Sequence, residues 1–135
     1  MSIKEQTTVK EKYYNEAIRY MDNANEMLHK AGKEDRYYKD DKYVKAACGI
    51  AYSGVLKALD GYLILMDVEK KKGRKSIEYY HEQVGKRDRK LLKELNDAYE
   101  ILHLNGYYDG NTNVKIISLG FEFAYHIIEK IKPQH

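Results

Sequence analysis

Apolar residues recur at steps of three and four over most of the chain, which is the spacing of one face of an α-helix. The first such stripe consists of Tyr14, Ala17, Met21, Ala24 and Leu28. We predict that Thr8 begins this helix, because Thr8-Val9-Lys10-Glu11 fits a capping box, and that Gly32 ends it. Residues 1–7 are then expected to be disordered.

A longer apolar segment follows the charged linker from Lys33 to Asp40. Asp40 or Asp41 is predicted to cap a helix that runs to about Lys71. Its main stripe is Val44, Ala47, Ala51, Val55, Ala58, Tyr62 and Leu65. A second stripe, about 100° away around the helix, is Tyr52, Leu56, Leu59 and Leu63. Because apolar residues cover much of its circumference, this helix is expected to be central.

Three further helices are predicted after Gly73. Ser76 caps a short helix, and Asp88 caps a fourth helix that Gly106 closes, with a loop from Tyr107 to Asn113. The last helix begins near Thr112 or Asn113 and ends at Pro133. No segment alternates with period two for long enough to be a strand. The expected fold class is therefore all-α: one domain over 1–135, an antiparallel four- or five-helix bundle with a disordered tail at 133–135.

Composition agrees with a globular protein, since 43% of the 135 residues are hydrophobic and 33% are charged. The one cysteine, Cys48, excludes an internal disulfide and is expected to be buried and inert. The N-terminus lacks the apolar core of a signal peptide, and the apolar run around Tyr62 to Met66 is too short to span a bilayer. We therefore expect a cytoplasmic protein that does not contact a membrane.

Charge is uneven along the chain although its net value is only +3. Residues 70–93 contain ten basic and three acidic side chains, so this segment carries +7. Such a segment can attract an anion or a nucleic acid, and it can equally be a solvated surface. The chain also has fourteen tyrosines and no tryptophan, and tyrosine suits surfaces that are partly buried or lie at interfaces.

A di-metal site is the sharpest catalytic alternative. Carboxylate bundles bind two metal ions through Glu-x-x-His pairs that point into the core. Four Glu–His pairs occur at helical spacing: Glu26/His29, Glu78/His81, Glu100/His103 and Glu122/His126. Three of these glutamates, Glu26, Glu100 and Glu122, lie roughly 140–160° from the apolar stripes of their helices, and we take all four to point away from the core. We therefore predict no metal site, no catalytic residue and no cofactor. Asp60 is expected to face solvent or to pair with a lysine.

The helix order and several residues resemble the HEPN (higher eukaryotes and prokaryotes nucleotide-binding) superfamily. The matching features are the first helix from Tyr14 to Leu28, the Ala-rich second helix from Ala46 to Leu65, the short segment with His81, and the final hairpin from Leu102 to Ile128. Active members cleave RNA with an Arg-x(4–6)-His motif just before the last helix. Here that stretch runs from His103 to Gly110 and has neither the Arg nor the second His. The resemblance thus implies a bacterial branch that lacks the motif.

Two functions follow from these observations. The first is a non-catalytic, homodimeric interaction module whose dimer interface is the second stripe, Tyr52, Leu56, Leu59 and Leu63. The second is RNA binding, with or without cleavage, as part of a bacterial defence or toxin system. Its candidate residues are Lys71, Arg74, Arg87, Arg89, Tyr107 and Tyr108. A protein partner is a further possibility for the first function.

Overall fold

Helices make up most of the computed structural model, which describes residues 1–134. The elements are α1 (Ile3–Ala31), β1 (Lys33–Glu34), β2 (Tyr37–Tyr38), α2 (Asp41–Leu65), α3 (Ile77–Gly85), α4 (Arg89–Ala98), the π-helix η1 (Tyr99–Tyr108) and α5 (Val114–Glu129). The all-α fold class expected from the sequence is confirmed. The two strands form only a minimal antiparallel pair, Lys33–Tyr38 and Glu34–Tyr37.

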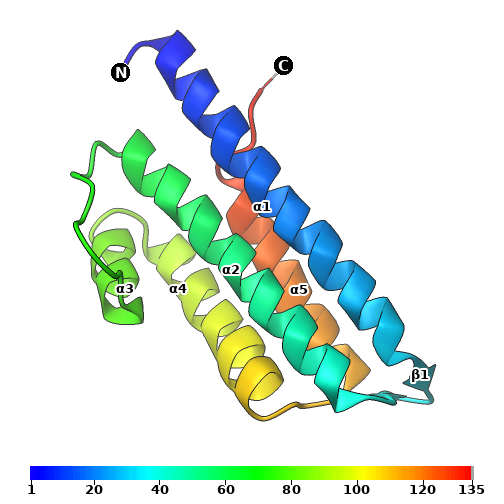
Figure 1. Cartoon of the computed structure of the whole chain (residues 1–135). Helices are drawn as coiled ribbons and strands as arrows, with labels where there is room; N and C mark the ends of the chain where they lie inside the picture. The colour runs from blue at the N-terminus through cyan, green and yellow to red at the C-terminus, as the bar shows by residue number, and fades with distance from the viewer. Residues whose placement is uncertain (135) are drawn as a thin grey trace.

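The long helices α1 and α2 run antiparallel beside each other and make the most extensive contact in the fold (Figure 1). Helix α2 also packs on η1 and α5, which confirms the central position that its apolar circumference predicted. Helix α4 continues into η1, packs against α5, and carries the short α3 on its outer side. One side of α2 remains open between α1 and the α3–η1 side of the molecule.

Helix α1 begins earlier than the sequence pattern predicted. Ser2, rather than Thr8, is the N-cap: its hydroxyl accepts a hydrogen bond from the backbone N–H of Glu5 at 3.0 Å. The Glu5 carboxylate accepts in turn from the backbone N–H of Ser2 at 3.2 Å, which completes a capping box. Thr8 lies inside the helix and donates its hydroxyl to the carbonyl of Lys4. The expected disorder of residues 1–7 is therefore wrong for residues 3–7.

Helix α2 ends at Leu65, well before Lys71. Asp67 has a φ of +58°, a left-handed conformation that stops the helical path. The lysines at 70–72 consequently lie in the loop between α2 and α3 instead of complementing a helix terminus. Asp40, Ser76, Asp88 and Asn113 cap the following helices, as predicted for these positions.

The segment from Tyr99 to Tyr108 is a π-helix, so the helix predicted to close at Gly106 continues past it. The backbone N–H of Asp109 donates to the carbonyl of Leu104, a bond of the wider i→i+5 type. Gly106 lies directly against Cys48 on α2; a Cβ at Gly106 would stand 2.6 Å from the Cβ of Cys48. A glycine is therefore what allows η1 to approach α2 this closely, and Tyr107 and Tyr108 are helical rather than in a loop.

Three of the four residues of the second apolar stripe of α2, the predicted dimer interface, are buried within the single chain. Tyr52, Leu59 and Leu63 are only 8%, 1% and 5% exposed within the single chain, and Leu56 alone is half-buried. The reason is that η1, α3 and α5 cover this side of α2. Homodimer formation itself remains a prediction. Cys48 is fully buried as expected, and burial raises the pKa of its thiol to about 12.

By length and composition, α2 could cross a bilayer, and it is the one such helix in the described part of the chain. More than half of its most apolar window is buried by the neighbouring helices. Its hydropathy is therefore explained by its place at the centre of the fold.

Candidate functional site

The open side of α2 is the floor of the candidate site. Gly49, Ser53, Leu56 and Asp60 follow one another at steps of four, three and four, which places them on one face of the helix. None of these four residues is fully buried. Three adjoining hollows follow one another along this face, from the N-terminal half of α2 to its C-terminal end.

The first hollow has a volume of about 460 Å³ and aromatic walls from two sides. Tyr20 lies on the α1 side, and Tyr107 of η1 lies on the other. A Cβ at Gly49 would stand 2.9 Å from the ring of Tyr107, so the glycine lets this ring lie against the floor. The full lining is Tyr20, Ala46, Gly49, Ile50, Tyr52, Ser53, His103 and Tyr107.

The second hollow, of about 390 Å³, shares Tyr52 and His103 with the first. We call the two together the aromatic groove. Arg74 and Lys75 enter the second hollow from the loop that precedes α3, so this end of the groove is cationic. Its lining is Tyr52, Leu56, Arg74, Lys75, Ser76, Ile77, Tyr80, Tyr99 and His103.

A row of stacked rings forms the η1 wall of the aromatic groove. Tyr99, His103 and Tyr107 are spaced by four residues, and His103 stacks on both neighbours: its centroid lies 5.2 Å from that of Tyr99 and 5.7 Å from that of Tyr107. Tyr52 of α2 packs on His103 at 4.9 Å, and Tyr108 meets His103 edge-on at the same distance. Tyr107 and Tyr108 are the exposed rings of this arrangement, whereas Tyr99 and His103 are half-buried and Tyr52 is buried.

Two titratable groups of the aromatic groove, His103 and Tyr52, are neutral near pH 7. Burial lowers the pKa of His103 below its ordinary value, so its imidazole carries no charge. Burial, followed by the neighbouring Tyr99, raises the pKa of Tyr52 well above the ordinary value. A neutral imidazole and a neutral phenol can stack and form hydrogen bonds without repelling a charged ligand of either sign. The electrostatic attraction of an anion to the groove therefore comes from Arg74 and Lys75.

The third hollow is smaller, about 180 Å³, and lies at the C-terminal end of α2. We call it the lysine pocket, because four of its lining side chains are lysines. It shares Lys75 with the aromatic groove. The lining is Tyr13, Lys57, Asp60, Leu63, Ile64, Val68, Glu69, Lys70, Lys71, Lys75 and Tyr79.

Asp60 connects α2 to the loop and to α3. Its Oδ1 accepts hydrogen bonds from the Nζ of Lys75 at 2.9 Å and from the hydroxyl of Tyr80 at 2.7 Å. Burial, together with this hydrogen bond to Asp60, raises the pKa of Tyr80. Pairing of Asp60 with a lysine agrees with the sequence expectation. The contact holds Lys75, and with it the adjacent Arg74, beside the groove.

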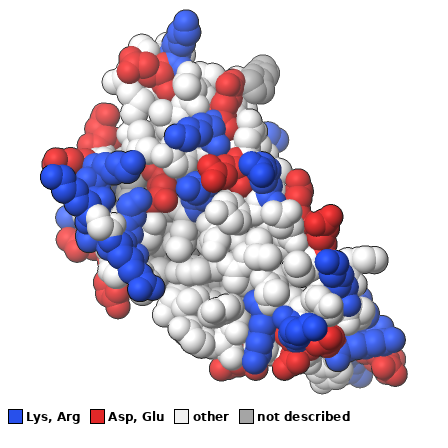
Figure 2. All heavy atoms as spheres, viewed as in Figure 1, with Lys and Arg blue, Asp and Glu red and all other residues white. Residues whose placement is uncertain are grey.

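The distribution of charge separates this side of the molecule into zones. Figure 2 shows Lys and Arg side chains gathered over the α2–α3 loop at the left, next to a broad surface over α2 and η1 with few charged side chains. The basic segment predicted from the sequence therefore borders an aromatic surface rather than standing alone.

The predicted RNA-binding residues divide into two groups. Arg74 and Tyr107 line the aromatic groove, Lys71 lines the lysine pocket, and Tyr108 contacts the ring of His103. Arg87 instead donates to the carbonyl of Gln83, and Arg89 is the exposed first residue of α4; neither lines any of the three hollows.

Sequence reasoning missed the centre of the site. Tyr52 was assigned to a dimer interface, and Tyr99, His103 and Tyr20 were given no role in binding. The spacing of Tyr99, His103 and Tyr107 by four residues was the signal that could have grouped them. Without the π-helix, however, Tyr107 was expected in a loop.

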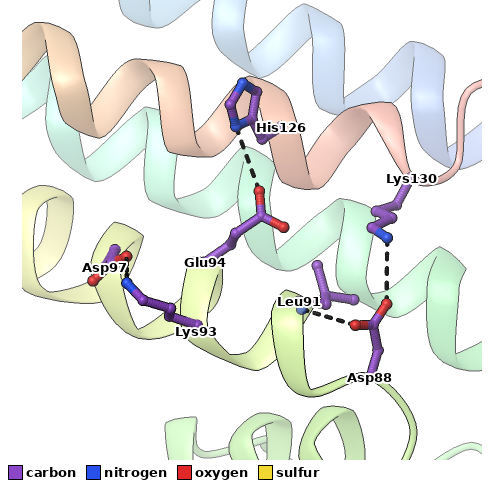
Figure 3. A network of polar contacts seen from close by, with 7 residues as sticks. All are labelled: Asp88, Leu91, Lys93, Glu94, Asp97, His126 and Lys130. Carbon is purple, nitrogen blue, oxygen red and sulfur yellow. Dashed lines mark hydrogen bonds and ion pairs between the residues drawn. The ribbon is translucent and has the colours of Figure 1, made fainter.

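Residues 1–134 contain no group of three or more His, Cys, Asp or Glu side chains arranged to hold a metal ion. His126 of the fourth Glu–His pair lies 3.4 Å from Glu94 of α4, in a polar contact between α4 and α5 (Figure 3). The four Glu–His pairs therefore do not come together in a metal-binding cluster within the described part of the chain.

The chain folds into a mostly helical domain with an aromatic groove that is edged by cationic side chains. A family model described as "Domain of unknown function (DUF5618)" matches residues 12–133, and the chain belongs to this family. The chain is also similar to a solved structure, a protein of unknown function from Dyadobacter fermentans. That match has 39% sequence identity and a TM-score of 0.79, and it covers 90% of this chain and 94% of the other. A search of curated proteins finds no significant match.

Proposed function

We propose that this protein binds single-stranded RNA in the aromatic groove, as a non-catalytic, HEPN-like module of the cytoplasm. The observation that carries the proposal is that the Tyr99–His103–Tyr107 stack and Arg74 lie in the same groove. Proteins that bind single strands combine these two elements, aromatic rings for the bases and cations for the backbone.

The size of the expected interaction follows from its two parts. Stacking of a base on an aromatic side chain is worth about 1–3 kcal/mol. Contacts of lysine and arginine with phosphates release counterions, so affinity falls as the salt concentration rises. Neither part reads a base sequence, and we therefore expect a preference for single strands over duplexes rather than for one sequence.

The test is the affinity of a short, fluorescently labelled single-stranded RNA, measured by anisotropy. Tyr107→Ala removes an exposed ring from the groove, and Tyr37→Ala is its matched control, because Tyr107 is 46% exposed and Tyr37 54%. We expect a loss of about 5- to 100-fold for Tyr107→Ala, the equivalent of one stacked base. The control should bind as the parent protein does.

The cationic end is tested in the same way. Arg74→Ala and Arg89→Ala remove the same charge from the same basic segment, but only Arg74 lines the groove. The proposal requires Arg74→Ala to weaken binding and to reduce its salt dependence, with a smaller effect for Arg89→Ala. If Arg74→Ala, Arg89→Ala and Tyr107→Ala all bound the RNA as tightly as the parent protein does, the groove would be rejected as the RNA site.

Cleavage of the bound RNA is a second reading of the same groove. Its support is that Arg74 and His103 line one hollow, although they do not form the Arg-x(4–6)-His motif. Incubation of the RNA with the protein, followed by gel analysis, separates the two readings. Intact RNA is the result that the non-catalytic proposal requires.

A homodimeric interaction module remains the second candidate function. Its support is no longer the stripe on α2 but the apolar side chains that η1 exposes, namely Leu104, Tyr107 and Tyr108. Aromatic residues are enriched at protein interfaces. The solution mass by light scattering tests it: a dimer that Tyr108→Ala converts to a monomer would favour this function.

A further inference from the structure

We infer that the lysine pocket binds the terminal phosphate of an RNA strand that lies in the aromatic groove, so that the protein recognises a strand end. This inference rests on the proposed function, because the groove must hold the strand that brings its end to the pocket. It names a ligand feature, a phosphate monoester, that the groove alone does not require.

Continuity of the surface is the first argument. The aromatic groove and the lysine pocket have Lys75 in common, and the open face of α2 forms the floor of both. From Gly49 to Ile64 this face extends over about 22 Å, at 1.5 Å per residue. Stacked nucleotides rise about 3.4 Å each, so the surface has room for roughly six of them. A strand that follows it from Tyr107 would therefore reach the pocket within a few nucleotides.

Charge is the second argument. Four lysines line the pocket against two carboxylates, Asp60 and Glu69. Asp60 already pairs with Lys75. The ammonium groups of Lys70 and Lys71 have no carboxylate partner within 4.0 Å anywhere in residues 1–134; Lys71 donates only to the carbonyl of Arg74. The pocket thus keeps two cations available for an incoming anion.

Shape is the third argument. The lysine pocket is less than half the volume of either hollow of the aromatic groove, and it is large enough for a phosphate group. Tyr13 and Tyr79 form its sides, and Lys57 and Lys71 lie over these rings at 5.9 and 5.8 Å. These contacts place the ammonium groups of Lys57 and Lys71 beside the aromatic sides of the pocket.

The chemistry of a strand end matches this arrangement better than an internal phosphate does. An internal phosphodiester carries one negative charge, whereas a terminal phosphate monoester, with a second pKa near 6, carries about −1.5 to −2 at pH 7. Lysine binds phosphate as a point charge and does not need a fixed fork geometry. Two available lysines therefore favour the more highly charged terminal group.

The experiment compares three unlabelled RNAs of one sequence as competitors for the labelled strand at pH 7.5. One has a 5′-phosphate, one a 3′-phosphate, and one hydroxyls at both ends. We expect one of the phosphorylated RNAs to compete about tenfold better than the hydroxyl-ended RNA, as one charge-assisted contact would give. Which of the two competes better also fixes the direction of the strand in the groove.

Two double variants locate the effect. Lys70→Ala/Lys71→Ala removes the available cations of the pocket, and Lys72→Ala/Lys90→Ala removes the same charge from exposed positions that do not line it. The inference requires the first variant to lose the preference for the terminal phosphate and the second to keep it. Thermal unfolding of both variants shows that the fold is retained.

The outcomes separate the inference from the proposed function. Equal competition by all three RNAs overturns the inference and leaves RNA binding in place. A phosphate preference that survives in Lys70→Ala/Lys71→Ala also overturns it, since the preference would then come from general attraction. Absence of binding by any RNA overturns both.

Discussion

The imidazole of His103 stacks on the ring of Tyr107 with planes only 15° apart, although Tyr107 lies in a segment that the sequence marks as a loop. The π-helix carries both residues to the open face of α2. Gly49 lies beneath Tyr107 and leaves the space that the ring occupies. The wall of the groove therefore depends on a backbone conformation and on a missing side chain as much as on the aromatic residues themselves.

Replacement of Gly49 by alanine should separate binding from stability. A mid-helix glycine costs up to about 1 kcal/mol relative to alanine, so Gly49→Ala should leave the free energy of unfolding unchanged or raise it. The added methyl group would meet the ring of Tyr107 at 2.9 Å and displace it from the floor. We expect weaker RNA binding by a protein that is at least as stable, measured by anisotropy and urea unfolding. An unchanged affinity would mean that the position of Tyr107 is not important for binding.

Gly106→Ala should have the opposite result, a loss of stability. Its methyl group would overlap Cys48, which is fully buried and cannot move aside. Overpacking of this kind costs about 1–3 kcal/mol. Gly85→Ala is the control, because its Cβ would meet only the flexible end of Leu92 at 3.1 Å. Equal unfolding midpoints in urea for the two variants would show that η1 does not pack on α2 as described.

Asp88 stabilises the junction of α3, α4 and α5 (Figure 3). Its Oδ1 accepts from the backbone N–H of Leu91 at 2.9 Å, and its Oδ2 lies 3.3 Å from the Nζ of Lys130. Loss of an N-cap costs about 0.5–2 kcal/mol, so Asp88→Ala should be destabilising by this amount. Asp88→Asn keeps the capping oxygen and should cost less.

The pH dependence of this contact has a definite sign. The Leu91 N–H, and then Lys130, lower the pKa of Asp88 below its ordinary value near 3.9. Because the pKa of this carboxyl is lowered in the folded protein, its charged form stabilises the fold when the pH is above the ordinary pKa. This stabilisation is lost as the pH falls through the lowered pKa. The stability difference between the parent protein and Asp88→Asn should therefore be present at pH 6 and shrink below pH 4 in urea titrations. A difference that is independent of pH would contradict the charged contact.

Alkaline pH should destabilise the protein through its buried tyrosines. Burial raises the pKa of Tyr38, Tyr52, Tyr62 and Tyr80 above the ordinary value near 10, and it raises that of Cys48 to about 12. Because these pKa values are raised in the folded protein, the neutral side chains stabilise the fold fully when the pH is below the ordinary pKa. This stabilisation is lost as the pH rises through the raised pKa. Urea unfolding should show a fall in stability from about pH 9 upward. Tyr80→Phe should reduce the slope above pH 10; an unaltered slope would assign the fall to other groups.

Sequence periodicity was sufficient for the fold class because apolar stripes and capping residues are local signals. The stripe of α1, the central position of α2 and the caps at Ser76, Asp88 and Asn113 all follow from them. The position at which α2 ends was predicted wrongly, because the neighbouring sequence does not predict the left-handed conformation of Asp67. Ser2 was missed as a cap because Thr8 has the same spacing to a glutamate.

The candidate site was only partly predictable because it depends on contacts between distant segments. Arg74, Lys71 and Tyr107 were predicted from the basic segment and from the high tyrosine content. Arg87 and Arg89 belong to the same basic segment, but they do not line the site. His103 appeared first as half of a Glu-x-x-His pair. Its neighbour Tyr107 lies four residues away on η1, but its neighbour Tyr52 comes from α2, and no spacing rule joins Tyr52 to His103.

Chemical-shift mapping by NMR tests the central claim most directly, and a chain of 135 residues is well suited to it. Addition of a short single-stranded RNA should shift the amides of Gly49, Ser53, His103 and Tyr107, and the shifts should reverse as salt is added. The exposed residues Asp22, Glu26, His29 and Lys30, which share one face of α1 and line a hollow outside the groove, should not respond. Shifts confined to that face, or no shifts at all, would contradict RNA binding in the aromatic groove.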